Sequence, residues 1–301
     1  MDQVLSKVAQ LNEIGIALSA ATDVDVLCDK ILNGAMELTN ADGGSLYRMS
    51  DDKTSLEFVI VSTHSLDIHM GGRSGHEIKF PAIPLMVSGK PNKSNVVSSA
   101  VHDARTINIP DAYHAQGFDF SGTRKFDQQT GYRTQSILTI PLTNHHKEII
   151  GVLQLINARD EANAANREFS NADQQLAESL ASQAAVAITN NKLIEEQREL
   201  FEAFIKLMAS AIDEKSPYTG GHCKRVPELT MMIADACHDS QSAALKDFRM
   251  TEKDRYELTI AGWLHDCGKV TTPEYVVDKA TKLETIYDRI NTVDTRFEVL
   301  K

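Results

Sequence analysis

Residues 171–212 read NADQQLAESLASQAAVAITNNKLIEEQRELFEAFIKLMASAI and indicate a single long helix. Mostly apolar side chains recur in it at alternating steps of four and three residues, which is the spacing of a heptad seam. The seam residues are Val186, Asn190, Leu193, Gln197, Leu200, Phe204, Leu207 and Ala211. The stretch contains no glycine or proline, so nothing interrupts the helix before Pro217. At about 1.5 Å per residue the helix would be roughly 60 Å long, too long to be packed inside one small domain.

The seam predicts a parallel homodimer formed through this helix. Polar residues at seam positions, here Asn190 and Gln197, fix the register and the number of partners in a coiled coil at some loss of stability. The alternative is a helix that packs only against its own domain. In either case the helix divides the chain, and we predict a sensor domain over 1–170, a connecting helix over 171–212 and a second domain over 213–301.

The overall composition suits a two-domain cytoplasmic protein. The 301 residues are 42% hydrophobic and 24% charged. A net charge of −11 argues against nucleic acid or an anionic membrane surface as the main partner, because phosphate binding needs a basic face. The four cysteines form no C-x-x-C pair, which fits a reducing compartment. The sequence shows no signal peptide, and no apolar run approaches the ~20 residues that span a bilayer.

The first domain is predicted to be α+β. Apolar residues at helical spacing mark a helix over 4–18 and another over 27–38, the second capped by Thr22 or Asp23. Alternating patterns then predict two hairpins, with strands at 45–49, 56–61, 136–142 and 149–156. The long middle region 70–134 is typical of a binding loop or of short elements. The order indicates an antiparallel sheet with helices on one side.

Asp127, Thr130 and Thr134 are candidate contacts for a purine. Their spacings of three and four would place them on one face if the segment is helical. A carboxylate accepts from ring N–H and amine groups, and threonine hydroxyls donate or accept. A helix N-terminus in the middle region would suit a cyclic phosphate. The alternative is that Asp127 caps a short helix and the threonines only form part of a loop.

Three strings of this domain resemble the regulatory GAF domains of cyclic-nucleotide phosphodiesterases and adenylyl cyclases. They are ADGGSLY at 41–47, NIPDAY at 108–113 and DQQTGYRTQSIL at 127–138. The resemblance covers most of residues 1–195 and implies a GAF fold with a bound cyclic nucleotide, cAMP or cGMP. It implies a pocket formed by Ser45, Ile109, Ala112, Phe118, Asp127, Thr130, Thr134 and Gln154.

The nucleotide-binding members of that family carry a signature of Asn-Lys, then Phe, then Asp-Glu, which holds the shape of the pocket. Asn157, Phe169 and Asp173 match it. Ala158 stands at the lysine position, with Arg159 beside it, and Gln174 stands at the glutamate position. The lysine–aspartate ion pair of the signature is therefore missing from its usual positions.

The second domain contains a candidate metal site. A helical pattern places His222, Val226, Leu229 and Ile233 on one face, so that His222 points toward the interior. Further on, His265 and Asp266 stand near a helix end. Two imidazoles and a carboxylate form a mixed set that suits iron, manganese or another transition metal, and such a metal can activate water for attack on a phosphoester. The alternative is a buried structural histidine.

The strings YTGGHCKRV at 218–226 and HDCGKVTTP at 265–273 resemble the cyclic-di-GMP-hydrolysing branch of the HD phosphohydrolase superfamily. By that resemblance, His222, His265 and Asp266 would be ligands of a divalent iron or manganese, with Asp266 bridging two ions. Lys269 would contact the phosphate, which makes Asp266 and Lys269 the catalytic candidates. The implied protein is a cyclic-nucleotide sensor that controls an HD-type phosphodiesterase.

The second domain departs from that pattern after residue 265. It contains no later histidine and no Gly-Tyr-Pro motif, and the acidic residues that remain available are Asp278, Asp288 and Asp294. The chain also stops in what the pattern indicates is the middle of a helix. We expect either a fragment of a longer protein or a degenerate HD domain, and no phosphodiesterase activity from the chain as written. The alternatives are a non-catalytic binding and dimerisation module, or a GAF domain that serves dimerisation alone.

Overall fold

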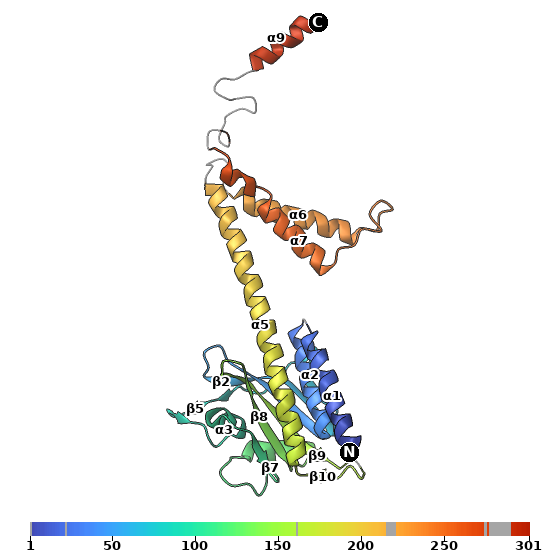
Figure 1. Cartoon of the computed structure of the whole chain (residues 1–301), viewed down its shortest axis with the longest axis vertical. Helices are drawn as coiled ribbons and strands as arrows, with labels where there is room; N and C mark the ends of the chain where they lie inside the picture. Colours follow the sequence, from blue (N-terminus) through green and yellow to red (C-terminus); the bar gives the residue numbers. More distant parts are fainter. Residues whose placement is uncertain (1, 22, 161, 215–220, 274–275, 277–289) are drawn as a thin grey trace. The chain divides into compact units, whose positions relative to one another are not determined.

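The computed structural model describes residues 2–21, 23–160, 162–214, 221–273, 276 and 290–301. The chain forms two compact units, Met1–Ile194 and Glu195–Lys301, and helix α5 (Asn171–Glu214) contributes to both (Figure 1). The predicted long helix is confirmed: it begins at the expected residue and continues past 212. In the described part of the chain, no helix is both long enough and apolar enough to cross a bilayer.

The first unit is built on an eight-stranded antiparallel sheet. The main path has the order β3-β2-β1-β9-β8-β7, with β4 beside β2 and β10 beside β9. Both predicted hairpins are confirmed, because β1 pairs with β2 and β8 with β9. The bounds are β1 Ala41–Met49, β2 Ser55–Thr63, β3 Ile68–Gly71, β4 Ile83–Pro84, β7 Ile107–Ile109, β8 Ile137–Thr143, β9 Ile149–Arg159 and β10 Asn166–Arg167, with a separate pair β5 Met86–Val87 and β6 Lys90–Pro91.

Three helices cover one face of this sheet. They are α1 (Asp2–Ser19), α2 (Val24–Thr39) and the first part of α5 (Figure 1). Alternation along β9 sends Leu153 and Leu155 into the core beneath these helices, where both are fully buried, and sends Gln154 to the opposite face. Each fully buried leucine contributes roughly 1.5–3 kcal/mol relative to an exposed one.

Two local features fix α2 against the sheet. Asp23 caps the helix, because its carboxylate accepts from the amide of Val26 at 2.9 Å. Thr22, the other predicted cap, lies outside the described residues. Gly44 allows the close approach of helix and sheet, since a Cβ at that position would stand 2.8 Å from a carbonyl oxygen of β9 and 2.8 Å from a leucine methyl of α2.

The middle region of the chain covers the opposite face of the sheet. It contributes α3 (Val96–Asp103) and α4 (Ser121–Thr130). Of the two 3₁₀ turns, η1 (His64–Leu66) follows β2, and η2 (Gly72–Ser74) lies against α2, where the amide of Arg73 donates to Asp29 at 3.1 Å. Two further apolar clusters lie on this side, one that includes Tyr47 and Val152 and one that includes Ile109 and Ile137. The region that the sequence predicted to be a loop or short elements therefore builds a second layer.

The second unit contains the end of α5 and a helical pair. Its elements are α6 (His222–Asp239), α7 (Glu252–Leu264), the 3₁₀ turn η3 (Cys267–Thr271) and α9 (Ile290–Leu300). Thr251 begins α7 with a capping box, in which its hydroxyl and the carboxylate of Asp254 each bond the other's backbone amide. Gly262 lets α6 and α7 approach closely, because a Cβ there would meet the Cα of Pro227 at 3.0 Å.

Candidate functional site

A cavity of about 450 Å³ lies in the first unit, on the sheet face opposite α1 and α2. Strands β1, β2, β8 and β9 line one side of it, and the beginnings of α3 and α4 line the other. The volume falls in the range of roughly 300–1,000 Å³ that is typical of small-molecule sites.

Aromatic side chains form the apolar wall of this cavity. The rings of Tyr47 and Phe58 have centroids 4.6 Å apart, and those of Phe58 and Phe80 are 5.4 Å apart. Flat ring surfaces favour stacking with a planar ligand. Tyr47 is buried, and this burial raises the pKa of its phenol above the ordinary value, so the hydroxyl stays protonated.

A chain of hydrogen bonds forms the polar floor. Tyr47 donates to Oε1 of Gln154 at 3.2 Å, and Nε2 of Gln154 donates to the hydroxyl of Thr139 at 3.1 Å. These bonds fix the orientation of the amide. After these bonds, Gln154 still has one Nε2 hydrogen to donate to a ligand, and the oxygen of Tyr47 can still accept a hydrogen bond from one.

The start of α4 gives the cavity a positive dipole end. Phe120 precedes the helix and provides no side-chain cap, and the first intrahelical bond runs from the amide of Arg124 to Phe120 at 2.9 Å. The amides of Gly122 and Thr123, both in the cavity wall, come before that bond and so lack an i−4 partner. Asp119 stands beside them, and hydrogen bonds from Ser121 hold the pKa of its carboxyl below the usual value.

The start of α3 is already satisfied. The side-chain oxygen of Asn95 accepts from the amides of Val97 and Ser98 at 3.0 and 3.1 Å. Of the two helix N-termini in the cavity wall, the one at α4 is therefore the better position for an anionic group.

The predicted ligand residues fall into four groups. Thr134 and Gln154 line the cavity. Ser45 is buried on β1 and lies opposite Gln154 in the register. Ile109, Ala112 and Phe118 belong to an apolar cluster behind the wall, with Phe118 at its margin. The last two, Asp127 and Thr130, are not among the residues that line the cavity.

Asp127 is buried and accepts three hydrogen bonds from the protein. Its Oδ2 accepts from the hydroxyl of Tyr113 at 3.0 Å and from the amide of Thr134 at 2.8 Å, while Oδ1 accepts from the hydroxyl of Thr134 at 2.8 Å. Asp127 and Thr130 lie on one helix, as their spacing predicted. Thr134 does not, because α4 ends at Thr130 and Gly131 adopts a left-handed conformation. Thr130 is exposed and bonds the carbonyl of Phe126. The carboxylate thus holds Thr134 in the cavity wall.

The segment that follows α4 is held at both ends. Tyr132 donates to buried Asp42 at 2.7 Å, and Asp42 also pairs with Arg159 at 2.8 Å. Asn157 of the predicted signature accepts from the amide of Gln135 at 2.7 Å, and its amide group donates to the carbonyl of residue 133 at 2.8 Å. Several polar residues of the string at 127–138, among them Asp127, Tyr132 and Thr134, thus fix the backbone around the cavity wall.

Sequence reasoning missed most of the cavity wall. Tyr47 follows from alternation, since it shares a strand face with Ser45, and Asn95 follows from its position as a helix cap. Phe58, Phe80 and the start of α4 had no local signal, because only the folded middle region brings them to the sheet. That part of the site was not predictable from pattern alone.

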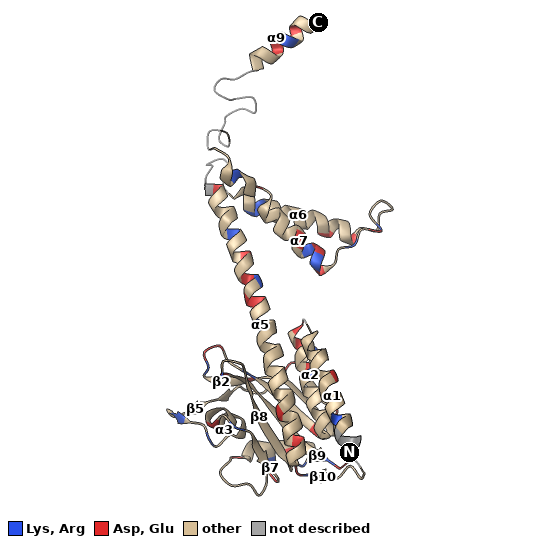
Figure 2. Cartoon of the chain, viewed as in Figure 1, with Lys and Arg blue, Asp and Glu red and all other residues tan. Residues whose placement is uncertain are grey.

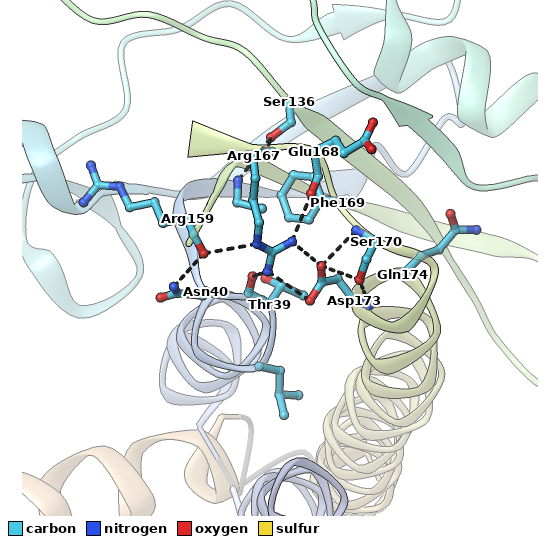
Figure 3. A network of polar contacts seen from close by, with 12 residues as sticks. Thr39, Asn40, Ser136, Arg159, Arg167, Glu168, Phe169, Ser170, Asp173 and Gln174 are labelled. Carbon is cyan, nitrogen blue, oxygen red and sulfur yellow. Dashed lines mark hydrogen bonds and ion pairs between the residues drawn. The ribbon is translucent and has the colours of Figure 1, made fainter. Parts of the chain in front are cut away.

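The ion pair of the predicted signature is present in altered form. Arg167 lies opposite Ala158 in the pairing of β10 with β9, and its Nη1 meets Oδ2 of Asp173 at 2.6 Å (Figure 3). The same guanidinium reaches the carbonyl of Thr39 at 3.5 Å and that of Arg159 at 3.3 Å. A cation from the neighbouring strand thus replaces the missing lysine, and it joins α2, the sheet and the first turn of α5.

Asp173 keeps its charge although it is buried. Burial opposes ionisation, but hydrogen bonds from Arg167 and Ser170 outweigh it and hold the pKa of Asp173 below the usual value. Ser170 contributes both its amide and its hydroxyl, at 2.9 and 2.8 Å (Figure 3). The carboxylate also lies in the first turn of α5, where the helix dipole favours an anion.

The second unit brings the three predicted metal ligands together. Nε2 of His222 and Nε2 of His265 are 3.1 Å apart, and Oδ2 of Asp266 lies 3.6 and 3.3 Å from them. Among the described residues this is the only cluster of three or more His, Cys, Asp or Glu residues with converging ligand atoms. Nδ1 of His265 meets the carbonyl of Gly262 at 2.6 Å, which leaves Nε2 as its free ligand atom. Lys269 contacts Asp266 at 2.6 Å, so the two catalytic candidates are adjacent.

The predicted orientation of α6 is wrong. Leu229 and Ile233 are 56% and 66% exposed, whereas the buried residues of the helix are Cys223, Pro227 and Ala234. The buried face is the one that packs against α5 and α7, and His222 lies at its edge, half-buried, rather than in the interior. Burial raises the pKa of the Cys223 thiol to about 11.

The other acidic candidates do not join this cluster. Asp278 and Asp288 lie outside the described residues, as does the part of the 218–226 string before residue 221. Asp294 lies on α9 and does not belong to the cluster of converging ligand atoms. Within the described residues, the site therefore has three protein ligands.

Comparison with known proteins identifies the first unit. A family model for the GAF domain matches residues 23–188. The dual 3',5'-cyclic-AMP and -GMP phosphodiesterase 11A of Takifugu rubripes is 27% identical over 205 residues, which cover 66% of this chain and 21% of that protein. A cGMP-specific 3',5'-cyclic phosphodiesterase of Drosophila erecta is 32% identical over 140 residues, covering 45% of this chain and 11% of the relative. The chain thus spans about a fifth or less of the length of these relatives.

Solved structures with similar folds include other GAF domains. The GAF domain of a phosphoenolpyruvate-protein phosphotransferase from Coxiella burnetii is 14% identical with a TM-score of 0.48, covering 64% of this chain and 98% of that chain. The GAF domain/HD domain protein from Geobacter sulfurreducens is 17% identical with a TM-score of 0.40, covering 58% of this chain and 98% of that chain.

Replacing Arg167 with methionine is expected to lower the free energy of unfolding by about 1–3 kcal/mol at pH 7, because buried Asp173 loses its charged partner. Arg105→Met is the matched control: it removes an exposed guanidinium 3.6 Å from Asp103 and should change stability by less than about 0.5 kcal/mol. Urea unfolding measures both, and equal effects of the two variants would contradict the assigned role.

The difference in unfolding free energy between wild type and Arg167→Met has a defined pH dependence. Because the folded pKa of Asp173 is depressed, its contribution to stability is present above its unfolded pKa of about 3.9 and is lost as pH falls through the lower folded value. The stability difference between wild type and Arg167→Met should therefore shrink as the pH is lowered below about 4. A difference that stays constant down to pH 2.5 would rule out the ion pair as its cause.

Proposed function

The chain belongs to the GAF domain family, and we propose that its first unit binds a cyclic nucleotide, cAMP or cGMP, in the cavity beside α4. The observation that carries the proposal is the make-up of this cavity: an aromatic wall, a polar floor at Gln154 and the uncapped start of a helix. The names of the relatives support it, because they describe phosphodiesterases specific for cGMP or active on both cAMP and cGMP.

Each part of the ligand would meet a suitable group. The purine would stack on the aromatic wall and exchange hydrogen bonds with Gln154 and Thr134. The cyclic phosphate would lie at the start of α4, where free amides and the dipole favour an anion. Asp119 would accept from the ribose hydroxyl rather than approach the phosphate. Asp127 would act indirectly, by holding Thr134 in place.

Blocking the cavity should abolish nucleotide binding without unfolding the domain. Ser121 is exposed and lies in the cavity wall, so Ser121→Trp should fill the cavity and weaken binding of cAMP or cGMP by at least about 100-fold. Thr130→Trp, on the same helix but outside the wall, should leave affinity unchanged. Calorimetric titration with each nucleotide measures this, and equal affinity of the two variants would place the ligand elsewhere.

We further propose that the nucleotide controls an HD-type metal-dependent phosphodiesterase of the cyclic di-GMP class, to which the second unit contributes metal ligands. Two imidazoles and one carboxylate within 4.8 Å of one another fit a divalent iron or manganese. Such a metal would supply an activated water for attack on a phosphoester. His222, His265 and Asp266 would hold it, with His265 oriented by its bond to Gly262, and Lys269 would contact the phosphate.

The second candidate is a non-catalytic module that binds ligand and dimerises. It is favoured by the limited donor set, because the described residues supply three metal ligands and leave Leu229 and Ile233 of α6 exposed. Hydrolysis of cyclic di-GMP by any full-length form of the protein, loaded with manganese, separates the two candidates, since only the first allows turnover.

Removing either histidine should weaken metal binding. We expect His222→Ala and His265→Ala each to raise the dissociation constant for Mn²⁺ by at least about tenfold, whereas His145→Ala at an exposed hairpin tip should not change it. Free Mn²⁺ is measured by electron paramagnetic resonance. Wild-type affinity in both histidine variants would contradict the site.

We also propose that α5 forms a parallel homodimer. Its seam residues are exposed in the single chain, with Leu193, Leu200 and Leu207 at 50%, 72% and 68%. The residues that α5 buries within its own units, such as Ala184 and Ile205, lie outside the seam. Acidic and basic side chains interleave along the second half of α5 (Figure 2), as they do on the flanks of coiled coils.

A charge in the seam should separate the subunits. We expect the double variant Leu200→Glu and Leu207→Glu to sediment as a monomer at concentrations where wild type is a dimer, because four like charges would face one another across the seam. Lys206→Glu, next to the seam but outside it, should remain dimeric. A wild-type chain that is monomeric at high concentration, with and without nucleotide, would remove this proposal.

A further inference from the structure

The last turn of α5 caps the helix that begins with His222. The two carboxylate oxygens of Asp213 accept from the amide of Cys223 at 3.2 and 3.1 Å. Gly221, at the N-cap of α6, adopts a left-handed conformation and provides no side-chain cap. The usual local cap is thus replaced by a carboxylate from another helix, where it also complements the positive end of the helix dipole.

The same turn of α5 also contacts the helix that leads to the other ligands. Ala209 and Ile212 of α5 are buried against Cys223, and Trp263 of α7 packs on this cluster. Cys223 directly follows His222, and Trp263 stands two residues before His265. The backbone segments that carry both imidazoles therefore rest on the end of α5.

We propose that Asp213 is a positioning residue that couples the state of α5 to the metal site formed by His222, His265 and Asp266. This inference rests on the proposed function and adds the contact through which regulation acts. Metal affinity depends on the placement of the ligand atoms. A shift of α5 that draws the carboxylate from the amide of Cys223 would displace the start of α6, which carries His222, and would change metal affinity without any ligand contacting the metal.

The coupling is measurable in the whole 301-residue chain as a change in Mn²⁺ affinity on addition of nucleotide. In wild type, saturating cAMP or cGMP should change the Mn²⁺ dissociation constant by at least about fivefold, and by reciprocity Mn²⁺ should change nucleotide affinity by the same factor. Electron paramagnetic resonance measures Mn²⁺, and calorimetry measures the nucleotide.

Asp213→Ala should weaken Mn²⁺ binding by about tenfold, because the amide of Cys223 loses its acceptor. In this variant, nucleotide should no longer change the Mn²⁺ dissociation constant. Nucleotide affinity without metal should stay at the wild-type value. Asp213→Asn keeps an acceptor and should restore part of the coupling. Ser210→Ala, exposed on the same turn of helix, is the matched control and should behave as wild type.

The outcomes distinguish this inference from the function on which it rests. If wild type binds both Mn²⁺ and nucleotide and Asp213→Ala retains full coupling, or if wild type shows no coupling, this inference alone is overturned. If wild type binds no Mn²⁺ or no nucleotide, the proposed function fails and the inference fails with it.

Discussion

The ion pair between Arg167 and Asp173 is the contact on which the arrangement of the first unit depends. It ties strand β10 to the first turn of α5, and the same guanidinium reaches the carbonyl that ends α2 (Figure 3). Removing the guanidinium from so buried a carboxylate would cost about 1–3 kcal/mol, although Lys7 lies 4.0 Å away, so the sheet and the helix are held in one arrangement. Because the sheet also carries the cavity floor, the start of α5 is fixed relative to any ligand that the cavity holds.

The role of Asp127 shows how a buried charge can serve a binding site without touching the ligand. Asp127 is buried, and all three donors to its carboxylate come from Tyr113 and Thr134, so a purine that replaced one of these donors would break a bond that holds the wall. Displacement would leave a buried donor without a partner, which costs about 1–3 kcal/mol. The carboxylate is therefore better suited to holding the wall of the cavity than to reading the base.

Features encoded by neighbouring residues were predictable from the sequence. The two hairpins follow from period-two alternation, and α5 follows from a heptad pattern without glycine or proline. Asp23 caps α2 because its side chain needs only the amide three residues later. In each case the information lies within a few residues of the element that it specifies.

Features that depend on tertiary neighbours were not predictable in the same way. Arg167 replaces the lysine of the signature only because strand pairing sets it opposite Ala158, a relation between residues that no local pattern displays. Helix α6 offers two faces at helical spacing, and the one through Leu229 is the more apolar. The other face is buried because Ala209 and Ile212 of α5 pack against Cys223, so tertiary packing overrides hydrophobicity.

The positions that α5 uses for its own contacts explain why one helix can serve two units and still bind a partner. In the first unit it buries residues such as Ala184, and in the second unit Ala209 and Ile212, all outside the heptad seam. The seam stays exposed along its length, from Val186 to Leu207. An unbroken helix links the backbone of the two units through continuous hydrogen bonds. In the proposed dimer the seam would limit the rotations that α5 can make, because only those that keep apolar residues against the partner would preserve the contact.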